Sequence, residues 1–329
     1  MISSLYIEKD VRDDERVKVI RQRFDRIETI ECEHYGEIFN RKAQNFRLQK
    51  KNPALILAKK HKGFVLPAPA AYSIGGDANY YFSHMMNCIY DCRYCFLQGM
   101  YRSANYVVFV NYEDFADEIR KVAAQHGDQP VYFFSGYDCD SLALEPVTRF
   151  IEFMLPVFES IPNAYLELRT KSTQIRSLLD REAFDKCIVA FSLSPENIVD
   201  ALEAKTASLD KRIDAMKKLQ NKGWPIGLRF DPLIYFDDYQ QVYADFFQKV
   251  FKSLDVDGIH SVSLGAFRMP EKFFKNMVKL YPDEKLFASK LQTNDGMTSY
   301  AYDLEKEMQA YCESELFKYL PKQKYFTCF

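Results

Sequence analysis

The sequence has no hydrophobic run long enough to cross a bilayer. No apolar stretch in its 329 residues approaches the roughly 20 residues that a transmembrane helix requires. The first residues, MISSLY, lack the basic-then-apolar pattern of a secretory signal, and no internal repeat or low-complexity segment is visible. These absences argue against a membrane protein or a repeat array, and we expect a cytoplasmic protein.

The chain also lacks a large net charge of either sign. It carries 44 Lys and Arg against 46 Asp and Glu, a formal charge of −2, so it has no global nucleic-acid signature. The charges are unevenly distributed, however, because residues 41–62 contain eight Lys or Arg and no Asp or Glu. This basic segment is compatible with phosphate binding and equally with a solvated surface.

Strand and helix patterns alternate from about residue 80. Such alternation predicts a parallel sheet with right-handed crossovers. Six units indicate an α/β fold with a partial (β/α)6 TIM-like barrel, rather than a closed barrel of eight units. The predicted strands are 80–86, 131–135, 165–169, 187–193, 225–230 and 259–264, and the predicted helices are 112–125, 145–159, 173–180, 195–203, 209–221, 238–252 and 270–280.

The barrel is expected to occupy residues 78–284. Residues 1–77 are interpreted as a partly basic N-terminal extension, with a helix at 14–26 and a short strand at 27–31. Residues 285–329 are expected to form an α+β tail that packs on the barrel. Ser208 is the expected N-cap of the helix that begins at residue 209. A further apolar run covers 106–110, and the tail is expected to hold a helix at 304–317.

Eight cysteines are present, and three of them lie in one short segment, Cys88, Cys92 and Cys95, with C-x3-C-x2-C spacing. In a cytoplasmic chain, thiols this close together indicate metal or catalytic use more than disulfides. Three thiolates can hold three irons of a [4Fe–4S] cluster and leave the fourth iron open to a substrate. The other cysteines are scattered, and most are expected to be structural or incidental: Cys32, Cys139, Cys187, Cys312 and Cys328.

Two other interpretations of the cysteine segment stay open. A zinc knuckle needs a fourth ligand, for which His84, Cys139 and Cys187 are available. A chance cluster is the other, because free Cys is among the most buried residue types. Tyr94 stands directly before the third cysteine, and C-x3-C-x-aromatic-C is typical of radical S-adenosylmethionine (SAM) enzymes. The segment resembles theirs.

Polar residues follow the other predicted strands, at the end where barrels carry their chemistry. Because the cysteine segment follows the first strand, we expect it to face these other strand ends across the mouth of the barrel. The strand-end segments are 135–140, 170–172, 192–194, 229–232 and 265–268.

The chain resembles the spore photoproduct lyase family over roughly residues 35–325. These radical SAM enzymes revert the thymine dimer of ultraviolet-irradiated spores. Similar segments occur in the family's order: Cys88–Gln98, Tyr106–Asn111, Asp140–Glu145 with Thr148, Thr170-Lys171, Phe191-Ser192, Glu203–Ser208 and Gly223–Gly227.

The resemblance implies the cofactors, the partners and the residues that bind them. Cys88, Cys92 and Cys95 match the ligands of a [4Fe–4S] cluster, and Tyr94, Lys171 and Ser192 match positions that bind SAM. The implied partners are damaged DNA and a reductant such as flavodoxin or ferredoxin, and we expect a monomer. Candidate contacts to DNA are Arg268, Tyr300 and Tyr302.

In the implied mechanism, a 5′-deoxyadenosyl radical abstracts hydrogen from C6 of the lesion, a Cys returns a hydrogen atom, and a Tyr relays the radical. This sequence departs from that pattern at both positions, with Tyr137 in place of the Cys and Phe96 in place of the Tyr. Cys139 stands two residues from Tyr137, and residues two apart on a strand end face the same way. Tyr137 and Cys139 are therefore both candidate hydrogen donors.

Two other functions remain open. One is a radical SAM enzyme that acts on a different nucleotide or on a small molecule. The other is a metal-bearing nucleic-acid-binding protein without turnover.

Overall fold

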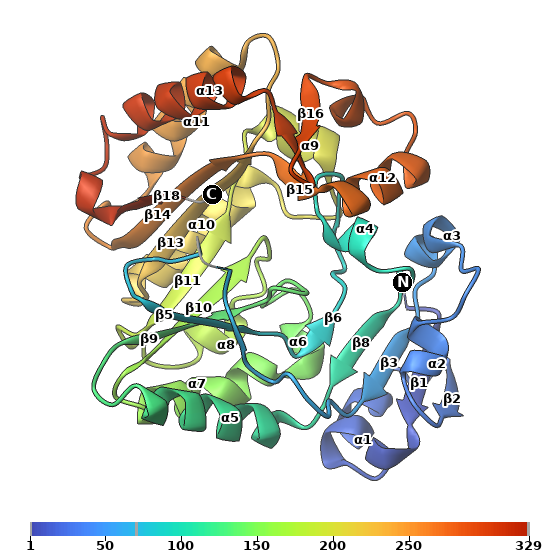
Figure 1. The fold of residues 1–329 in the computed structure, drawn as a ribbon. Coiled ribbons are helices and arrows are strands. Elements are labelled where there is room, and N and C mark those ends of the chain that lie inside the picture. The colour runs from blue at the N-terminus through green and yellow to red at the C-terminus, as the bar shows by residue number, and fades with distance from the viewer. Residues whose placement is uncertain (1, 70–71, 328–329) are drawn as a thin grey trace.

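The computed structural model describes residues 2–69 and 72–327, and its two main sheets, a larger and a smaller one, are both mostly parallel (Figure 1). The larger sheet has the strand order β18-β14-β13-β11-β10-β9-β5-β4. Its central strands, β5 (Ala78–Phe82), β9 (Val131–Ser135), β10 (Ala164–Thr170), β11 (Cys187–Ser192), β13 (Ile226–Leu233) and β14 (Ile259–Ala266), are parallel throughout. The predicted partial barrel of six strands is confirmed.

Amphipathic helices connect these strands and cover the outer face of the sheet (Figure 1). In α5 (Tyr112–Gln125), Phe115, Ile119 and Val122 are buried, because residues three or four apart share one helix face. The other helices between successive barrel strands are α7 (Phe150–Ser160), α8 (Arg176–Leu179), α9 (Glu196–Leu202), α10 (Leu209–Asn221) and α11 (Tyr239–Ser253), whereas α12 (Glu271–Leu280) packs on the short helix α4 (Leu97–Met100).

One predicted helix is interrupted, and one predicted helix cap is not formed. The helix predicted at 145–159 is broken at Arg149, which has φ 50°, into α6 (Glu145–Thr148) and α7. The buried Glu145 carboxylate accepts the amides of Ile151 and Glu152 at 3.0 and 2.9 Å, so it caps α7 from the preceding turn. Helix α10 begins where predicted, but the Ser208 side chain makes no capping hydrogen bond.

The smaller sheet holds the N-terminal strands, in the order β2-β1-β3-β8-β6. Its strands β1 (Ser4–Glu8), β2 (Glu28–Cys32), β3 (Leu55–Ala58) and β8 (Tyr106–Phe109) are mutually parallel, and β6 (Met85–Met86) is antiparallel to β8. Among the strands of residues 1–77, only β2 was predicted from the sequence. The strand predicted at 80–86 is divided between the sheets, with β5 in the larger and β6 in the smaller. The short helices of this region are α1 (Glu15–Gln22), α2 (Gly36–Phe39) and α3 (Phe46–Lys51).

The C-terminal segment packs on one edge of the barrel. A three-stranded antiparallel sheet joins β15 (Arg268–Pro270), β17 (Met297–Tyr300) and β16 (Leu291–Asn294), followed by α13 (Tyr302–Leu316). Strand β18 (Tyr325–Thr327) is parallel to β14 at that edge, and β4 (Leu66–Pro67) closes the opposite one. Within the described part of the chain, no helix combines the length and the apolar character that crossing a membrane needs.

Candidate active site

A cavity of about 320 Å³ lies at the carboxyl ends of the barrel strands. The loop that follows β5 lies on one side of it, and the ends of β9, β10, β11, β13 and β14 contribute the rest. Ligands bind at this end of parallel α/β sheets because the loops there converge. Nine of the eleven predicted site residues line the cavity: Cys88, Cys92, Tyr94, Cys95, Tyr137, Cys139, Lys171, Ser192 and Arg268.

The two remaining predicted residues lie elsewhere. Tyr300 is 1% exposed, and its hydroxyl accepts the backbone amide of Tyr235 at 2.9 Å. Tyr302 is the first residue of α13 and is 63% exposed, with the Lys306 ammonium 4.3 Å from its ring centroid. The structure therefore gives Tyr300 a packing role and leaves Tyr302 on the surface, away from the cavity.

The cysteine loop is held from the N-terminal side by Lys50. The Lys50 ammonium donates to the carbonyl of Cys88 at 3.0 Å and to that of Tyr90 at 2.8 Å. The side chain is 7% exposed, and burial lowers its pKa. Lys50 belongs to the basic segment 41–62, so one cation of that segment supports the loop and is not part of a solvated surface.

The barrel holds the other side of the loop. Strands β7 (Asp91–Cys92) and β12 (Glu203–Ala204) form a short antiparallel pair that sets Cys92 opposite Glu203. The Gln98 amide donates to the Cys92 carbonyl, and its oxygen accepts the hydroxyl of Tyr281 at 2.7 Å. Backbone and side chain thus fix the loop from two directions.

The three cysteine sulfurs do not all lie within 4.8 Å of one another. Sulfurs bound to one tetrahedral zinc at about 2.3 Å lie roughly 3.8 Å apart. A [4Fe–4S] cube holds each thiolate on a separate iron, so a wider spacing and three donors suit it better. The donor set fits the cluster.

Two of the three candidate zinc ligands, His84 and Cys187, do not join the three cysteines, whereas Cys139 lines the cavity with them. His84 is buried and stacks on Phe150 with centroids 3.9 Å apart, and burial lowers its pKa to about 3. Cys187 lies in the core of β11, and neither residue lines the cavity. Burial raises the pKa of Cys88 to about 12 and also raises those of Cys92 and Cys95. Cys328 lies outside the described residues.

Glu203 connects the residues that surround Tyr94. Its carboxylate accepts the Tyr94 hydroxyl and lies 2.5 Å from the Arg212 guanidinium and 3.5 Å from the Lys171 ammonium. Burial alone raises the pKa of Glu203, but the attraction of Lys171 and Arg212 outweighs it and lowers the pKa to about 2. Lys171 has three N–H donors, so it can pair with Glu203 and still donate to a carboxylate in the cavity.

Asp140 joins the ends of β9 and β10. One carboxylate oxygen accepts the Thr170 hydroxyl at 2.7 Å, and the other accepts the backbone amide of Lys171 at 2.7 Å. Gly136 lies in the turn that precedes Asp140 and has φ 86°, a conformation that favours glycine. A Cβ at this position would also lie 2.6 Å from the Ser141 hydroxyl. Asp140 and Glu203 lay within family-like segments of the sequence, but no pattern marked them as site residues.

The two positions that depart from the family lie side by side. The Tyr137 ring stacks on Tyr81, with centroids 4.3 Å apart, and its centroid is 5.7 Å from that of Phe96. Cys139 lies on the same loop and is 7% exposed, and burial raises its pKa. Both candidate donors therefore line the cavity, Tyr137 in an aromatic stack and Cys139 below the surface.

Cationic side chains stand at the far wall of the cavity. Arg169 lies 4.6 Å above the ring of Tyr72 and pairs with Glu167 at 2.9 Å. Arg268 is the first residue of β15. An acidic residue, Asp231, also lines the cavity, and its carboxylate accepts the Ser263 hydroxyl at 3.1 Å. Arg169 and Asp231 line the cavity with Arg268, although only Arg268 was predicted.

A partial barrel with three cysteines on the loop after its first strand, opposite polar strand ends, defines a radical SAM protein. The family model of spore photoproduct lyase matches residues 70–327. The chain therefore belongs to the spore photoproduct lyase family, which confirms the resemblance seen in the sequence.

Curated relatives and solved structures agree with this assignment. Spore photoproduct lyase of Bacillus subtilis (strain 168) is 24% identical over 266 residues, which cover 76% of this chain and 77% of the relative. The enzyme of Clostridium acetobutylicum is 20% identical over 74% of this chain and 70% of its own. A mutant spore photoproduct lyase solved with bound AdoMet and dinucleoside spore photoproduct matches with a TM-score of 0.86 and 17% identity, covering 100% of this chain and 98% of that chain.

Proposed function

We propose that the protein is a radical SAM lyase that repairs a thymine dimer of the spore photoproduct type in DNA. The observation that carries the proposal is the cavity, where the three cysteines face Tyr94, Lys171 and the strand ends. The family assignment supports it, since solved relatives are described with AdoMet and with dinucleoside spore photoproduct.

The residues present fit both cofactors. Cys88, Cys92 and Cys95 would hold the [4Fe–4S] cluster, and Tyr94, Lys171 and Ser192 would hold SAM. When bound, cluster and SAM together supply the hydrogen-abstracting radical. The Lys171 ammonium would pair with the SAM carboxylate as a point charge, while Glu203 keeps Lys171 and Tyr94 in place.

Tyr137 and Cys139 are the proposed donors of the returning hydrogen atom. Either the phenol O–H or the thiol S–H can break homolytically, so that a C–H bond forms on the product radical and an oxygen or sulfur radical stays on the protein. Tyr137 is the better placed, because it is half-buried at the cavity wall whereas Cys139 is buried.

The DNA would meet the open side of the cavity. Arg268 is the proposed contact near the lesion, because it is a cation at the cavity wall. Exposed cations of the basic segment, Arg41, Lys42, Arg47 and Lys51, would lie along phosphates. A base must leave the duplex stack to enter such a cavity. Flavodoxin or ferredoxin would supply the electron to a cytoplasmic monomer.

Anaerobic reconstitution followed by dithionite, SAM and irradiated DNA tests the proposal. We expect a brown protein with about four irons per chain, formation of 5′-deoxyadenosine, and loss of thymine dimers by mass analysis. Cleavage of SAM beside unchanged dimers would contradict the lesion and favour a different nucleotide or small molecule as substrate. A colourless protein would contradict the enzyme class.

Variants of the two donors test the hydrogen return. We expect Tyr137→Phe or Cys139→Ala to lower the repair rate while SAM cleavage continues, because only the later step is blocked. Tyr81→Phe is the matched control, since it keeps the stacked ring and removes a neighbouring phenol. If both donor variants repair at the parental rate, neither residue is the donor.

A further inference from the structure

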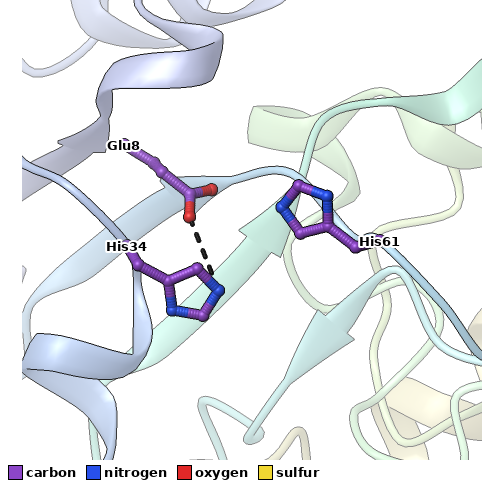
Figure 2. Close-up of side chains that lie close together, drawn as sticks. All are labelled: Glu8, His34 and His61. Atoms are coloured by element: carbon purple, nitrogen blue, oxygen red, sulfur yellow. Dashed lines mark ion pairs between the residues drawn. The ribbon is translucent and has the colours of Figure 1, made fainter.

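The carboxyl ends of three strands of the smaller sheet bring together one carboxylate and two imidazoles. Glu8 is the last residue of β1, His34 follows the end of β2, and His61 follows the end of β3. Because β2, β1 and β3 are neighbouring parallel strands, their ends meet at one edge. Figure 2 shows the three side chains pointing toward a common space.

The distances are close to those of a metal site. One ligand atom of each residue lies within 4.8 Å of the other two, and His34 Nε2 is 3.8 Å from Glu8 Oε1. The two imidazole rings lie nearly parallel, at 21°, with centroids 6.2 Å apart. Both histidines are exposed, so small rotations of their side chains can shorten the remaining distances.

Glu8 is buried and held in place. It is 1% exposed, and its carboxylate accepts the backbone amides of Lys59 at 2.7 Å and Tyr35 at 3.3 Å. A fixed, buried carboxylate beside exposed imidazoles is a preorganised ligand, because only the exposed partners lose conformational freedom on binding.

Nearby cations do not occupy the site. Lys9 pairs with Glu33, and the Lys60 ammonium lies 4.9 Å from the ring centroid of Phe109. Among the residues that the structure describes, the Glu8 carboxylate forms an ion pair with His34 and with no Lys or Arg. A neutral imidazole leaves that buried charge without a full counterion, which a divalent cation would supply.

We propose that Glu8, His34 and His61 bind a zinc ion. Two His nitrogens and one Glu oxygen are a zinc ligand set, with water in the fourth position. Imidazole ligands favour zinc over magnesium and calcium, which prefer oxygen alone. The ion would cross-link the ends of β1, β2 and β3, away from the cysteine loop. The inference does not depend on the proposed enzymatic activity.

His34 must change its hydrogen bonding when the metal binds. Its Nδ1 accepts the amide of Gly36 at 3.0 Å, so the proton of the neutral ring is on Nε2. Coordination through Nε2 moves this proton to Nδ1, and the Gly36 amide then bonds to water. The Gly36 contact is exposed, so water can replace it.

The test uses the full chain with its cluster reconstituted, so that the cysteine loop is occupied. Equilibrium dialysis against zinc with a competing chelator, followed by metal analysis, should give about one zinc per chain in addition to iron. His34→Asn and His61→Asn should each weaken zinc binding by at least about tenfold. His126→Asn is the control, because His126 pairs with the Tyr80 hydroxyl elsewhere in the fold.

Two further measurements distinguish loss of this site from misfolding of a variant and from zinc bound at another site. Zinc well above its Kd should raise the Tm of the parent by several degrees and leave that of the His34/His61 double variant unchanged. X-ray absorption at the zinc edge should show nitrogen and oxygen ligands. Equal zinc binding by parent and double variant, or sulfur ligands, would overturn the proposal. The primary variants spare Glu8, because its carboxylate also accepts backbone amides.

Discussion

At the scale of single residues, two buried charges far from the cysteines in sequence set the geometry of the site. Lys50 fixes the cysteine loop through two backbone carbonyls, and Glu203 fixes Tyr94 and Lys171. Sequence reasoning found the cysteines, Tyr94, Lys171 and Ser192 because spacing and family likeness mark them. It did not find the role of Lys50, because carbonyl partners 38 and 40 residues away leave no pattern in side-chain types.

Replacing Lys50 with Met should loosen the cysteine loop. Each lost hydrogen bond from a charged donor is worth about 1.5–3 kcal/mol, and the two part-buried carbonyls would lose this partner. We expect lower iron content after reconstitution and a changed EPR signal of the reduced cluster. Lys51→Met is the matched control, because Lys51 is the exposed neighbour on the same helix. Equal iron content and EPR signals in both variants would contradict a supporting role.

The stability of the folded chain should depend on the ionisation of Glu203. Its pKa is lowered from 4.5 to about 2 in the fold, so its stabilising contribution is complete above pH 4.5 and disappears as the pH falls toward 2. The linked free energy is on the order of 3 kcal/mol. Denaturant unfolding between pH 5 and pH 2.5 measures this loss.

Glu203→Gln should remove that part of the pH dependence. The variant should also be less stable at pH 7, by roughly 3–5 kcal/mol, because Arg212 stays buried without its counterion. Asp303→Asn, an exposed change on α13, should leave both quantities as in the parent. A variant with the parental pH profile would show that Glu203 is not the group that titrates.

At the scale of elements, the short helix after the cysteines depends on one close approach. Helix α4 (Leu97–Met100) packs against α12, and a Cβ on Gly99 would lie 2.3 Å from the Phe273 carbonyl oxygen. The Gly99 carbonyl accepts the side-chain amide of Asn276 at 2.9 Å. Backbone contact of this kind cannot be relieved by rotating a side chain, so α4 and α12 hold each other in register.

Gly99→Ala should push the two helices apart. Overpacking typically costs about 1–3 kcal/mol, and the shift should be transmitted to Phe96 and Gln98, which line the cavity. We expect a lower Tm and weaker SAM binding, measured by thermal unfolding and isothermal titration. Gly258→Ala is the control, since its Cβ would meet the flexible end of Gln220 at 3.0 Å. Equal Tm values for the two variants would contradict the close packing.

The elements of the barrel were more predictable than those around it. Alternating apolar runs and amphipathic helices identified all six parallel strands, and α5 and α10 agree with the predicted helices residue for residue. Strands β1 and β3 were missed because their pairing partners lie far away in sequence, so no local pattern marks them. The division of 80–86 between two sheets is also a tertiary effect, which no local pattern records.

At the scale of the whole molecule, the N-terminal region completes a sheet that the later chain cannot finish by itself. Strand β8 pairs with β3 on one side and β6 on the other. Removing β3 would expose four buried residues of β8, Tyr106–Phe109, along an open edge. Open edges of apolar strands promote aggregation.

Deleting residues 1–58 should therefore abolish soluble, iron-binding protein. The deletion removes Lys50 and every parallel partner of β8. Deleting 321–329, which removes the three-residue edge strand β18, should have a milder effect. Soluble yield and iron content measure both. A soluble N-terminal deletion that still binds iron would show that the barrel is independent.

The structure also implies an order in which the cysteine segment and its supporting residues are synthesised. The cysteine segment leaves the ribosome after Lys50 but well before Glu203 and Tyr281, whose side chains or backbone hold its other side. A nascent chain that ends before Glu203 therefore carries three thiols without either of these two supports. Iron loading is expected to follow completion of the barrel, so the cell must protect these thiols from oxidation until the last third of the chain has been made.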